Sequence, residues 1–366
     1  MYKLFIDKLK CIKPDDPTED ECRLDIYVDG SLFRTLKKSM KKSNTWEINQ
    51  SIYFNHFVQI TLTDEDNVKD DFLGAHMIPA VELAHSSYKF QLDNADYTLW
   101  LKVTIETGVI DPIEEAITEF ENSPVPDKMW WKNIAKADLI ADMRDKIKHP
   151  HHVSQNNYNL CGPAVIVYEL AKRSKLRYVD FCRKLYETNA YTSRDITVTA
   201  SATLLNSNFS SDISPADWML MTALRETEND VFEIDENMSG LAALTPSYDI
   251  ETWTKNILCF NSVEEINCNI IQDIKALREA RNVVSRGGVA FLLNNSRLVG
   301  NTNPSAEHLP THWVSLLGGV KIDLKNKLDL GDGIIEFRCY TWGKEEKYVV
   351  NEGDFRKHFY GAVTGE

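Results

Sequence analysis

The arrangement of apolar residues changes abruptly near residue 108, and this change constrains the fold more than any other feature of the chain. Before it, in residues 2–106, short stretches alternate apolar and polar residues and are separated by turns rich in Asp, Gly and Asn. This pattern predicts an antiparallel β-sandwich. After it, helical periodicity appears first and strands dominate 288–350. Helices followed by strands predict a separate α+β domain.

The segment 108–130 between these regions is typical of a linker, since it combines Pro112, an acidic helical stretch and the run 123–126 (Ser-Pro-Val-Pro). We therefore expect a multidomain chain with a sandwich over 1–107, a linker over 108–130 and an α+β domain over 131–366. A length of 366 residues is sufficient for two domains with their own cores.

Composition excludes several classes of function. The formal net charge of −14 argues against a nucleic-acid partner, because binding phosphates requires a basic surface. The sequence contains no run of 18 apolar residues and no signal-peptide core at its start, so we expect synthesis in the cytoplasm without Sec-type export or a transmembrane segment. Secretion by another route stays open. Seven scattered cysteines predict reduced thiols and no disulfide framework.

One cysteine lies where a helix is expected to begin. The segment 155–164 begins with a polar, turn-forming stretch and ends in Cys161-Gly162-Pro163-Ala164, directly before an apolar helical run. A helix N-terminus stabilises a thiolate through its free N–H groups and its dipole. Gln155 can place an amide N–H₂ beside the main-chain N–H of Cys161 to form an oxyanion hole. The alternative interpretation is a buried structural cysteine, which we keep for Cys182 and Cys339.

Nine histidines compete for the role of base. We favour His312, because it opens an alternating stretch that predicts a strand, and a strand holds an imidazole rigidly. His308 lies in the expected loop before it, and His358 is a weaker candidate near the end of the chain. The pairing of Cys161 with His312 predicts nucleophilic catalysis on a carbonyl.

These segments resemble the papain-like cysteine peptidase superfamily. The resemblance rests on Asn-x-Cys-Gly-Pro-Ala at 159–164, His-Trp-Val at 312–314 and Thr-Trp-Gly at 341–343. In particular they are similar to the Cys-Gly-Pro type domains of bacterial polymorphic toxins and secreted effectors. The resemblance implies Cys161 as nucleophile, His312 as base and Gln155 in the oxyanion hole, with no cofactor needed for catalysis.

The third catalytic partner departs from the family pattern. Papain-like enzymes orient the histidine with an Asn or Asp two residues before the Trp of a Trp-Gly pair, and that position is Tyr340 here. We therefore expect the imidazole to be oriented by the hydroxyl of Tyr340 or Thr341, or by a carboxylate such as Glu336, or else to act in a dyad.

The N-terminal region has two acidic loops, at 15–21 and 64–71. Loops of this kind can converge at one end of a sandwich and supply the oxygen ligands that Ca²⁺ takes. Together with the strand pattern they resemble the C2 domain, a family in which many members bind no calcium. The resemblance implies possible Ca²⁺ ligation by Asp25, Asp64, Asp66 and Asp71, with Asp20 or Glu19 as the first-loop ligand.

Two functions remain. The favoured one is a papain-like cysteine hydrolase or acyltransferase that acts on an amide bond of a protein or peptide substrate, as a protease, deamidase, transglutaminase or amidase. The resemblance adds a toxin or effector role. The alternative is an inactive papain-like fold that works as a binding or adaptor protein, with the C2-like region contacting a partner, a membrane or delivery machinery. The sequence leaves the oligomeric state open.

Overall fold

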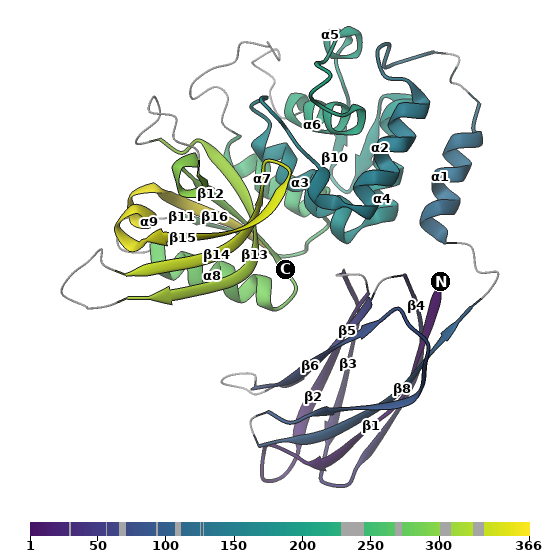
Figure 1. Cartoon of the computed structure of the whole chain (residues 1–366), viewed down its shortest axis with the longest axis vertical. Coiled ribbons are helices and arrows are strands. Elements are labelled where there is room, and N and C mark those ends of the chain that lie inside the picture. Colours follow the sequence, from purple (N-terminus) through teal and green to yellow (C-terminus); the bar gives the residue numbers. More distant parts are fainter. Residues whose placement is uncertain are drawn as a thin grey trace. The chain divides into compact units, whose positions relative to one another are not determined.

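A computed structural model describes residues 1–366 except 29–30, 56, 66–70, 93, 107–110, 125, 127, 228–244, 268–272, 301–308 and 325–332. The chain divides into two compact units, Met1–Glu114 and Glu115–Glu366 (Figure 1). Each unit has a core of its own, and each is described separately below.

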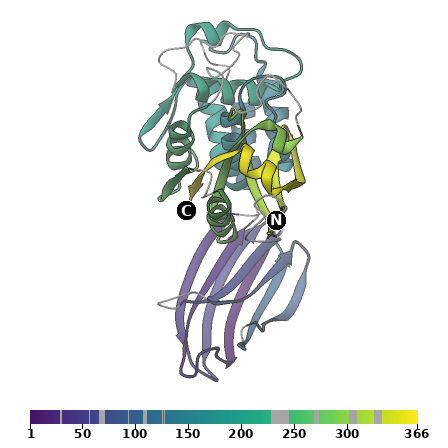
Figure 2. The same ribbon diagram turned by 90° about the vertical axis from the view of Figure 1, so that its left-hand side faces the viewer.

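The first unit consists of two antiparallel four-stranded sheets, whose strands run side by side in Figure 2. Their orders are β4-β1-β8-β7 and β3-β2-β5-β6. The strands are β1 (Tyr2–Lys13), β2 (Asp20–Val28), β3 (Ser31–Met40), β4 (Thr45–Phe54), β5 (Phe57–Asp64), β6 (Asp71–Pro79), β7 (Leu83–Phe90) and β8 (Asp96–Ile105).

Alternation along these strands builds the sandwich core. Leu24 and Ile26 of β2 lie opposite Leu62 and Ile60 of β5, and all four side chains are fully buried. Successive side chains of a strand point to opposite faces, so the residues between them face outward. The sandwich expected for 2–106 is confirmed.

The second unit is organised around a six-stranded antiparallel sheet of order β11-β16-β12-β13-β14-β15. These strands are β11 (Val263–Asn267), β12 (Val289–Asn294), β13 (His312–Asp323), β14 (Ile334–Thr341), β15 (Lys344–Asn351) and β16 (Phe359–Gly365). A separate two-stranded hairpin is formed by β9 (Tyr191–Ser193) and β10 (Ile196–Val198). The strands expected in 288–350 are therefore present.

The helices of this unit are mostly N-terminal to its sheet. They are α1 (Pro112–Asn122), α2 (Lys136–Lys148), η1 (Pro150–His152), α3 (Cys161–Arg173), α4 (Lys175–Thr188), α5 (Ala202–Asn206), α6 (Pro215–Thr227), α7 (Ser247–Asn256), α8 (Asp273–Ser285), η3 (Ser296–Val299) and α9 (Glu352–His358). None of the described helices combines the length and apolar character needed to cross a bilayer.

Two helices cover opposite faces of the six-stranded sheet. Leu277 of α8 belongs to the core cluster that contains Val314 and Leu316 of β13. Ser315, between them, donates a hydrogen bond to Glu169 of α3. Because neighbouring residues of a strand face opposite sides, α3 and α8 pack on the two faces of β13. The mixed helix-and-strand domain expected after the sandwich is confirmed at this level.

Helix α1 lies within the stretch expected to be a linker. It begins at Pro112, a residue well suited to the first helical position. Ile117 and Phe120 are buried, and the Phe120 ring meets Tyr186 of α4 edge-on at 5.8 Å. The acidic stretch of 108–130 is thus an amphipathic helix that packs against the second unit.

Candidate active site

Cys161 is the first residue of α3, as the Gly-Pro sequence after it indicates. Pro163 lies in the first turn, where main-chain N–H groups have no partner within the helix, so its missing N–H costs no helical hydrogen bond. All residues from Cys161 to Ala171 are buried, so the helix is held on every side. The thiol therefore sits on a rigid element, at the end that carries free N–H groups.

Burial dominates the electrostatics of the thiol. The Cys161 side chain is 5% exposed, and its burial raises the pKa of the thiol above the usual value. The main-chain N–H of Trp313, the charge of Arg225 and the N–H groups at the helix start act in the opposite direction but do not prevail. The resting thiol is consequently neutral at pH 7.

Thr245 packs directly on the start of α3. A Cβ added to Gly162 would lie 2.3 Å from Thr245 Oγ1, so this position admits no side chain. Arg225 Nη1 donates to Thr245 Oγ1 over 2.8 Å, and Trp313 Nε1 donates to the Thr245 carbonyl over 2.8 Å. Sequence reasoning missed Arg225 and Thr245, because they belong to no motif and lie far from Cys161 in the chain.

His312 begins β13 and is 3% exposed. Its Nε2 lies 2.6 Å from Thr341 Oγ1 at the end of β14. The indole of Trp342 stacks on the imidazole, with ring centres 4.2 Å apart and planes inclined by 15°. Burial lowers the pKa of His312 to about 3, so the ring is neutral at physiological pH. Of the three orienting groups expected from the sequence, Thr341 is the one in contact.

The other two orienting candidates have different partners. The Tyr340 hydroxyl donates to the Val153 carbonyl, and the Tyr340 ring stacks on Tyr168 of α3 with centres 3.8 Å apart. Glu336 forms an ion pair with Lys347 over 2.6 Å. Tyr340 therefore joins β14 to the loop before Cys161 instead of contacting the imidazole.

That loop carries Gln155, which is 7% exposed. Its Nε2 donates to the Tyr158 carbonyl over 2.8 Å. The loop is also held by Asp217 of α6, whose Oδ2 accepts the Ser154 N–H over 2.9 Å. Gln155 is thus fixed in the turn that leads into Cys161, with its amide directed to a carbonyl of that turn.

Asp217 belongs to a buried charge cluster. Lys146 of α2 lies 2.8 Å from Asp142 and 3.3 Å from Asp217, so two carboxylates share one ammonium group. Burial raises the pKa of Asp217 to about 7, although the Lys146 charge opposes that shift. The protonation of this carboxyl group therefore changes near neutral pH.

Cys161 and His312 meet through the main chain of β13. The N–H of Trp313, the residue that follows His312, lies close enough to the thiol to lower its pKa. Within the part of the chain that the structure describes, no hydrogen bond joins the thiol to the imidazole. The contact with Thr341 occupies His312 Nε2, and Nδ1 is the other ring nitrogen.

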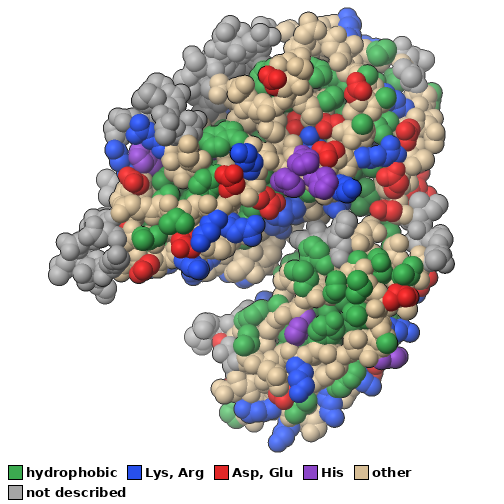
Figure 3. All heavy atoms as spheres, viewed as in Figure 1, with side chains coloured by type: hydrophobic (Ala, Val, Ile, Leu, Met, Phe, Trp, Pro, Cys, Tyr) green, Lys and Arg blue, Asp and Glu red, His purple; other side chains and the backbone are tan. Residues whose placement is uncertain are grey.

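The remaining histidine candidates are placed as follows. His308 lies outside the described residues, and His358 ends α9. His149, His151 and His152 form a cluster with ring centres 4.5 to 6.0 Å apart, and Figure 3 shows histidines gathered on the surface of the second unit.

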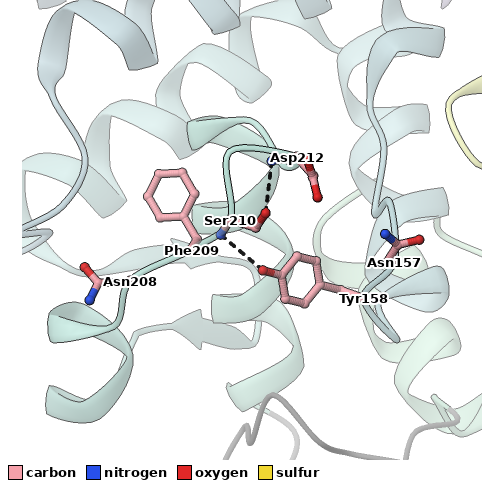
Figure 4. A pocket seen from close by; sticks show the side chains of 6 residues that line it. All are labelled: Asn157, Tyr158, Asn208, Phe209, Ser210 and Asp212. Carbon is pink, nitrogen blue, oxygen red and sulfur yellow. Dashed lines mark hydrogen bonds between the residues drawn. The ribbon is translucent and has the colours of Figure 1, made fainter.

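A pocket of about 460 Å³ lies at the turn before Cys161 (Figure 4). Two segments form it, one from the loop before α3 and one from the segment before α6. The Ser210 N–H donates to the Tyr158 hydroxyl over 3.2 Å and links the segments. The lining residues are Asn157, Tyr158, Asn208, Phe209, Ser210 and Asp212.

In the first unit, Asp20 and Asp25 have partners within the fold. Asp20 accepts the N–H groups of Asp15 and Asp16, both over 2.9 Å, and the Tyr97 hydroxyl over 2.6 Å. Asp25 accepts Arg23 Nε over 3.0 Å and the Thr35 hydroxyl over 2.6 Å. Asp20 therefore caps its own acidic loop.

Asp64, the last residue of β5, lies opposite Asp71, the first residue of β6. Asp25 lies farther along the sheet, because it pairs with Thr61 whereas Asp64 pairs with Cys22. Asp66 is outside the described residues. Among those that are described, no three His, Cys, Asp or Glu side chains are positioned to hold a metal ion.

No protein-family model and no curated protein sequence matches the chain. Solved structures that resemble its N-terminal part contain C2 domains. A calcium-bound pair of C2 domains from extended synaptotagmin 2 is 18% identical, with a TM-score of 0.22, over 34% of this chain and 53% of that one. The match thus spans about half the length of that structure.

Two further solved structures are C2 domains. One is 11% identical with a TM-score of 0.20, over 28% of this chain and 97% of that one. A C2 domain of plant extended synaptotagmin 1 is 12% identical, with a TM-score of 0.22, over 28% of this chain and 90% of that one.

Proposed function

We propose that the second unit is a papain-like cysteine hydrolase or acyltransferase that acts on an amide bond of a protein or peptide. One observation carries the proposal: the Cys161 thiol, at the N-terminus of a buried helix, touches the main-chain N–H of the residue next to His312. Gln155 in the turn before the cysteine and Trp342 stacked on the imidazole add to its support.

In the proposed reaction, the thiol proton passes to Nδ1 of His312 while the sulfur forms a bond to the amide carbonyl carbon. The carbonyl oxygen takes the negative charge and is stabilised by the Gln155 amide and the Cys161 N–H. The imidazolium then protonates the leaving amine as the C–N bond breaks. Water or an amine attacks the resulting thioester and releases the thiol.

In this proposal the Cys161 thiol and the His312 imidazole are both neutral before the reaction and do not form a thiolate–imidazolium ion pair. Burial raises the pKa of the Cys161 thiol and lowers that of His312, so the proton must move during attack. His312 then stays unprotonated across the physiological pH range and can accept a proton, but its lowered pKa makes it a weaker base than an ordinary imidazole. Thr341 holds Nε2, and Trp342 shields the ring from water.

Competitive alkylation tests the proposed pair. The native protein is treated with substoichiometric iodoacetamide at pH 7, and modification of each cysteine is measured by mass spectrometry. Cys259 provides an internal reference, because it is partly exposed. We expect Cys161 to react faster than Cys259 despite its burial. His312→Ala should slow Cys161 on the order of 100-fold, the contribution of a positioned base.

His152→Ala is the matched control, since His152 is an exposed histidine in η1. It should leave the Cys161 rate unchanged. Reaction of Cys161 no faster than that of Cys259 in the wild type contradicts the proposal. Once an activated thiol is established, peptide mass spectrometry of a protein mixture incubated with wild type or Cys161→Ala separates cleavage, deamidation and cross-linking. A toxin or effector role rests on the family resemblance alone.

The second candidate is an inactive papain-like fold that serves as a binding or adaptor protein. It is favoured by the neutral thiol, which lies beside the Trp313 N–H and makes no hydrogen bond to the imidazole among the described residues. On this interpretation, Cys161→Ser leaves every function of the chain intact, whereas the enzymatic proposal requires its loss. The same alkylation experiment decides between them.

For the first unit we propose a C2-like contact with a partner, a membrane or delivery machinery. Calcium binding by Asp20, Asp64, Asp66 and Asp71 remains part of that proposal. Asp20 and Asp25 fit it less well than Asp64 and Asp71, because Asp20 accepts three hydrogen bonds within the fold and Asp25 is held by Arg23 and Thr35. A ligand of the native state raises the melting temperature, so an unchanged Tm at millimolar Ca²⁺ contradicts calcium binding.

A further inference from the structure

The pocket beside the nucleophile turn has a distinct chemical character. Asp212 is the one charged residue among the six that line it, and Tyr158 and Phe209 contribute aromatic rings. Asn157 and Asn208 add amide groups. An acidic group among aromatic faces is the environment in which a lysine or arginine side chain is stabilised by both ion pairing and cation–π attraction.

The aromatic walls are held in place. The Phe209 ring stacks on Trp218 of α6 with centres 5.9 Å apart, and Tyr158 contacts the same indole at 5.2 Å. The Tyr158 hydroxyl accepts the Ser210 N–H, and Ser210 Oγ accepts the Asp212 N–H over 3.2 Å (Figure 4). The two lining segments and the acidic residue therefore form one connected structure.

The pocket is within reach of the nucleophile. Tyr158 precedes Cys161 by three residues, and such a segment spans at most about 11 Å. Its carbonyl accepts hydrogen bonds from Gln155 Nε2 and from the Leu160 N–H. The wall of the pocket and the oxyanion-hole candidate are thus parts of the same turn.

We propose that this pocket binds a lysine or arginine side chain of the substrate, one or two residues from the amide bond that Cys161 attacks. The inference rests on the proposed function and specifies its substrate class as basic peptides. The net charge of −14 favours the approach of such substrates as well.

Three thiol-directed probes test the proposal: the amides of chloroacetyl-lysine, chloroacetyl-norleucine and chloroacetyl-glutamate. Each alkylates a thiol by forming a C–S bond as chloride leaves, and the thiol proton passes to the imidazole and then to buffer. Modification of Cys161 is measured relative to Cys259, which cancels the intrinsic reactivity of each probe. We expect the lysine probe to label Cys161 about tenfold faster than the norleucine probe, with the glutamate probe slowest.

Asp212→Asn keeps the shape of the pocket and removes its charge, so the preference should fall below about twofold. Asp195→Asn is the matched control, because Asp195 is an exposed aspartate paired with Lys255 elsewhere on the unit. It should leave the tenfold preference unchanged.

Two outcomes separate the inference from the function on which it rests. Fast labelling of Cys161 by all three probes at equal normalised rates overturns the basic-substrate inference and leaves the activated thiol standing. Labelling of Cys161 no faster than that of Cys259 with any probe overturns both. A lysine preference that persists in Asp212→Asn also contradicts the assignment of this pocket.

Discussion

The candidate residues of the two units differ in where their polar partners come from. In the second unit, the surroundings of Cys161 are assembled from α3, α6, β13 and the residue Thr245, which are far apart in the chain. In the first unit, Asp25 is bound by Arg23 of its own strand and by Thr35 of the neighbouring strand. Asp20 accepts N–H groups of its own loop and the Tyr97 hydroxyl of the other sheet. The hydrogen bonds of Thr245 thus join segments that are distant in the chain, whereas those of Asp25 stabilise the sheet that carries it.

The largest effect is expected for the buried polar link between α3 and β13. Glu169 is 1% exposed, accepts the Ser315 hydroxyl over 2.5 Å and pairs with Arg173, which also donates to the Gly287 and Gly288 carbonyls. Glu169→Ala should lower the free energy of unfolding by about 3–5 kcal/mol, because it leaves buried partners uncompensated. Denaturant unfolding of the full chain measures the change.

The matched control for that link is Glu187→Ala in α4. Glu187 also forms an i,i+4 pair, with Arg183, but both side chains are partly exposed. We expect about 0.5 kcal/mol or less. Equal losses in the two variants would contradict the role assigned to Glu169.

The pH dependence of stability comes next. The folded pKa of His312, about 3, lies below its ordinary value of 6.5, so the folded state resists protonation that the unfolded state accepts. The stability from this group is present above pH 6.5 and is lost progressively as pH falls towards 3. At pH 4 the loss should reach roughly 3 kcal/mol.

Asp217 changes the pH dependence of stability in the opposite direction. The contribution of His312 is therefore measured by comparing the wild type with a His312 variant. The folded pKa of Asp217, about 7, lies above the ordinary 3.8, so its contribution is largest below pH 3.8 and is lost as pH rises through 7. His312→Gln should therefore flatten the acid-side loss of the free energy of unfolding, measured from pH 7 to 4. An unchanged slope in that variant contradicts a neutral, buried imidazole.

A third effect concerns the close contact at Gly162. Gly162→Ala places a Cβ against Thr245 and should cost about 1–3 kcal/mol of overpacking. Because the clash is with that side chain, Thr245→Gly should recover much of the loss in the double variant. Additive losses in a double-mutant cycle, measured by denaturant unfolding, would show that the two positions do not touch.

The smallest effect is expected in the first unit. Asp25→Asn weakens the contacts with Arg23 and Thr35, and we expect a loss of about 1 kcal/mol without added metal. If Asp25 is a calcium ligand instead, the variant should lose a Ca²⁺-induced rise in Tm. Thermal melts with and without Ca²⁺ separate the two roles.

The sequence was most informative where one local signal determines the structure. Gly162-Pro163 after Cys161 predicted a helix start, and alternation after His312 predicted a strand; both are present. The imidazole partner was harder to predict, because the choice between Tyr340 and Thr341 depends on the pairing of β13 with β14. That pairing shifts between Leu316 and Gly318.

Long-range partners had no local signal at all. Arg225 and Thr245 are ordinary residues of a helix and a loop until the fold brings them to Gly162. Asp25 is the opposite case, because its position matched a family pattern. In the fold it lies on the same face of β2 as Arg23, which donates a hydrogen bond to it. A side chain's partner is thus decided by register and packing, which a single sequence does not encode locally.

Trp313 interacts with two neighbouring residues. Its main-chain N–H lies beside the Cys161 thiol, and its indole N–H donates to the Thr245 carbonyl. Displacement of Thr245 would break the indole hydrogen bond and the Arg225 hydrogen bond together. The strand that carries His312 is then released from the residue that covers the start of α3. The start of α3 and the strand that begins at His312 are thereby joined through one residue that belongs to neither element.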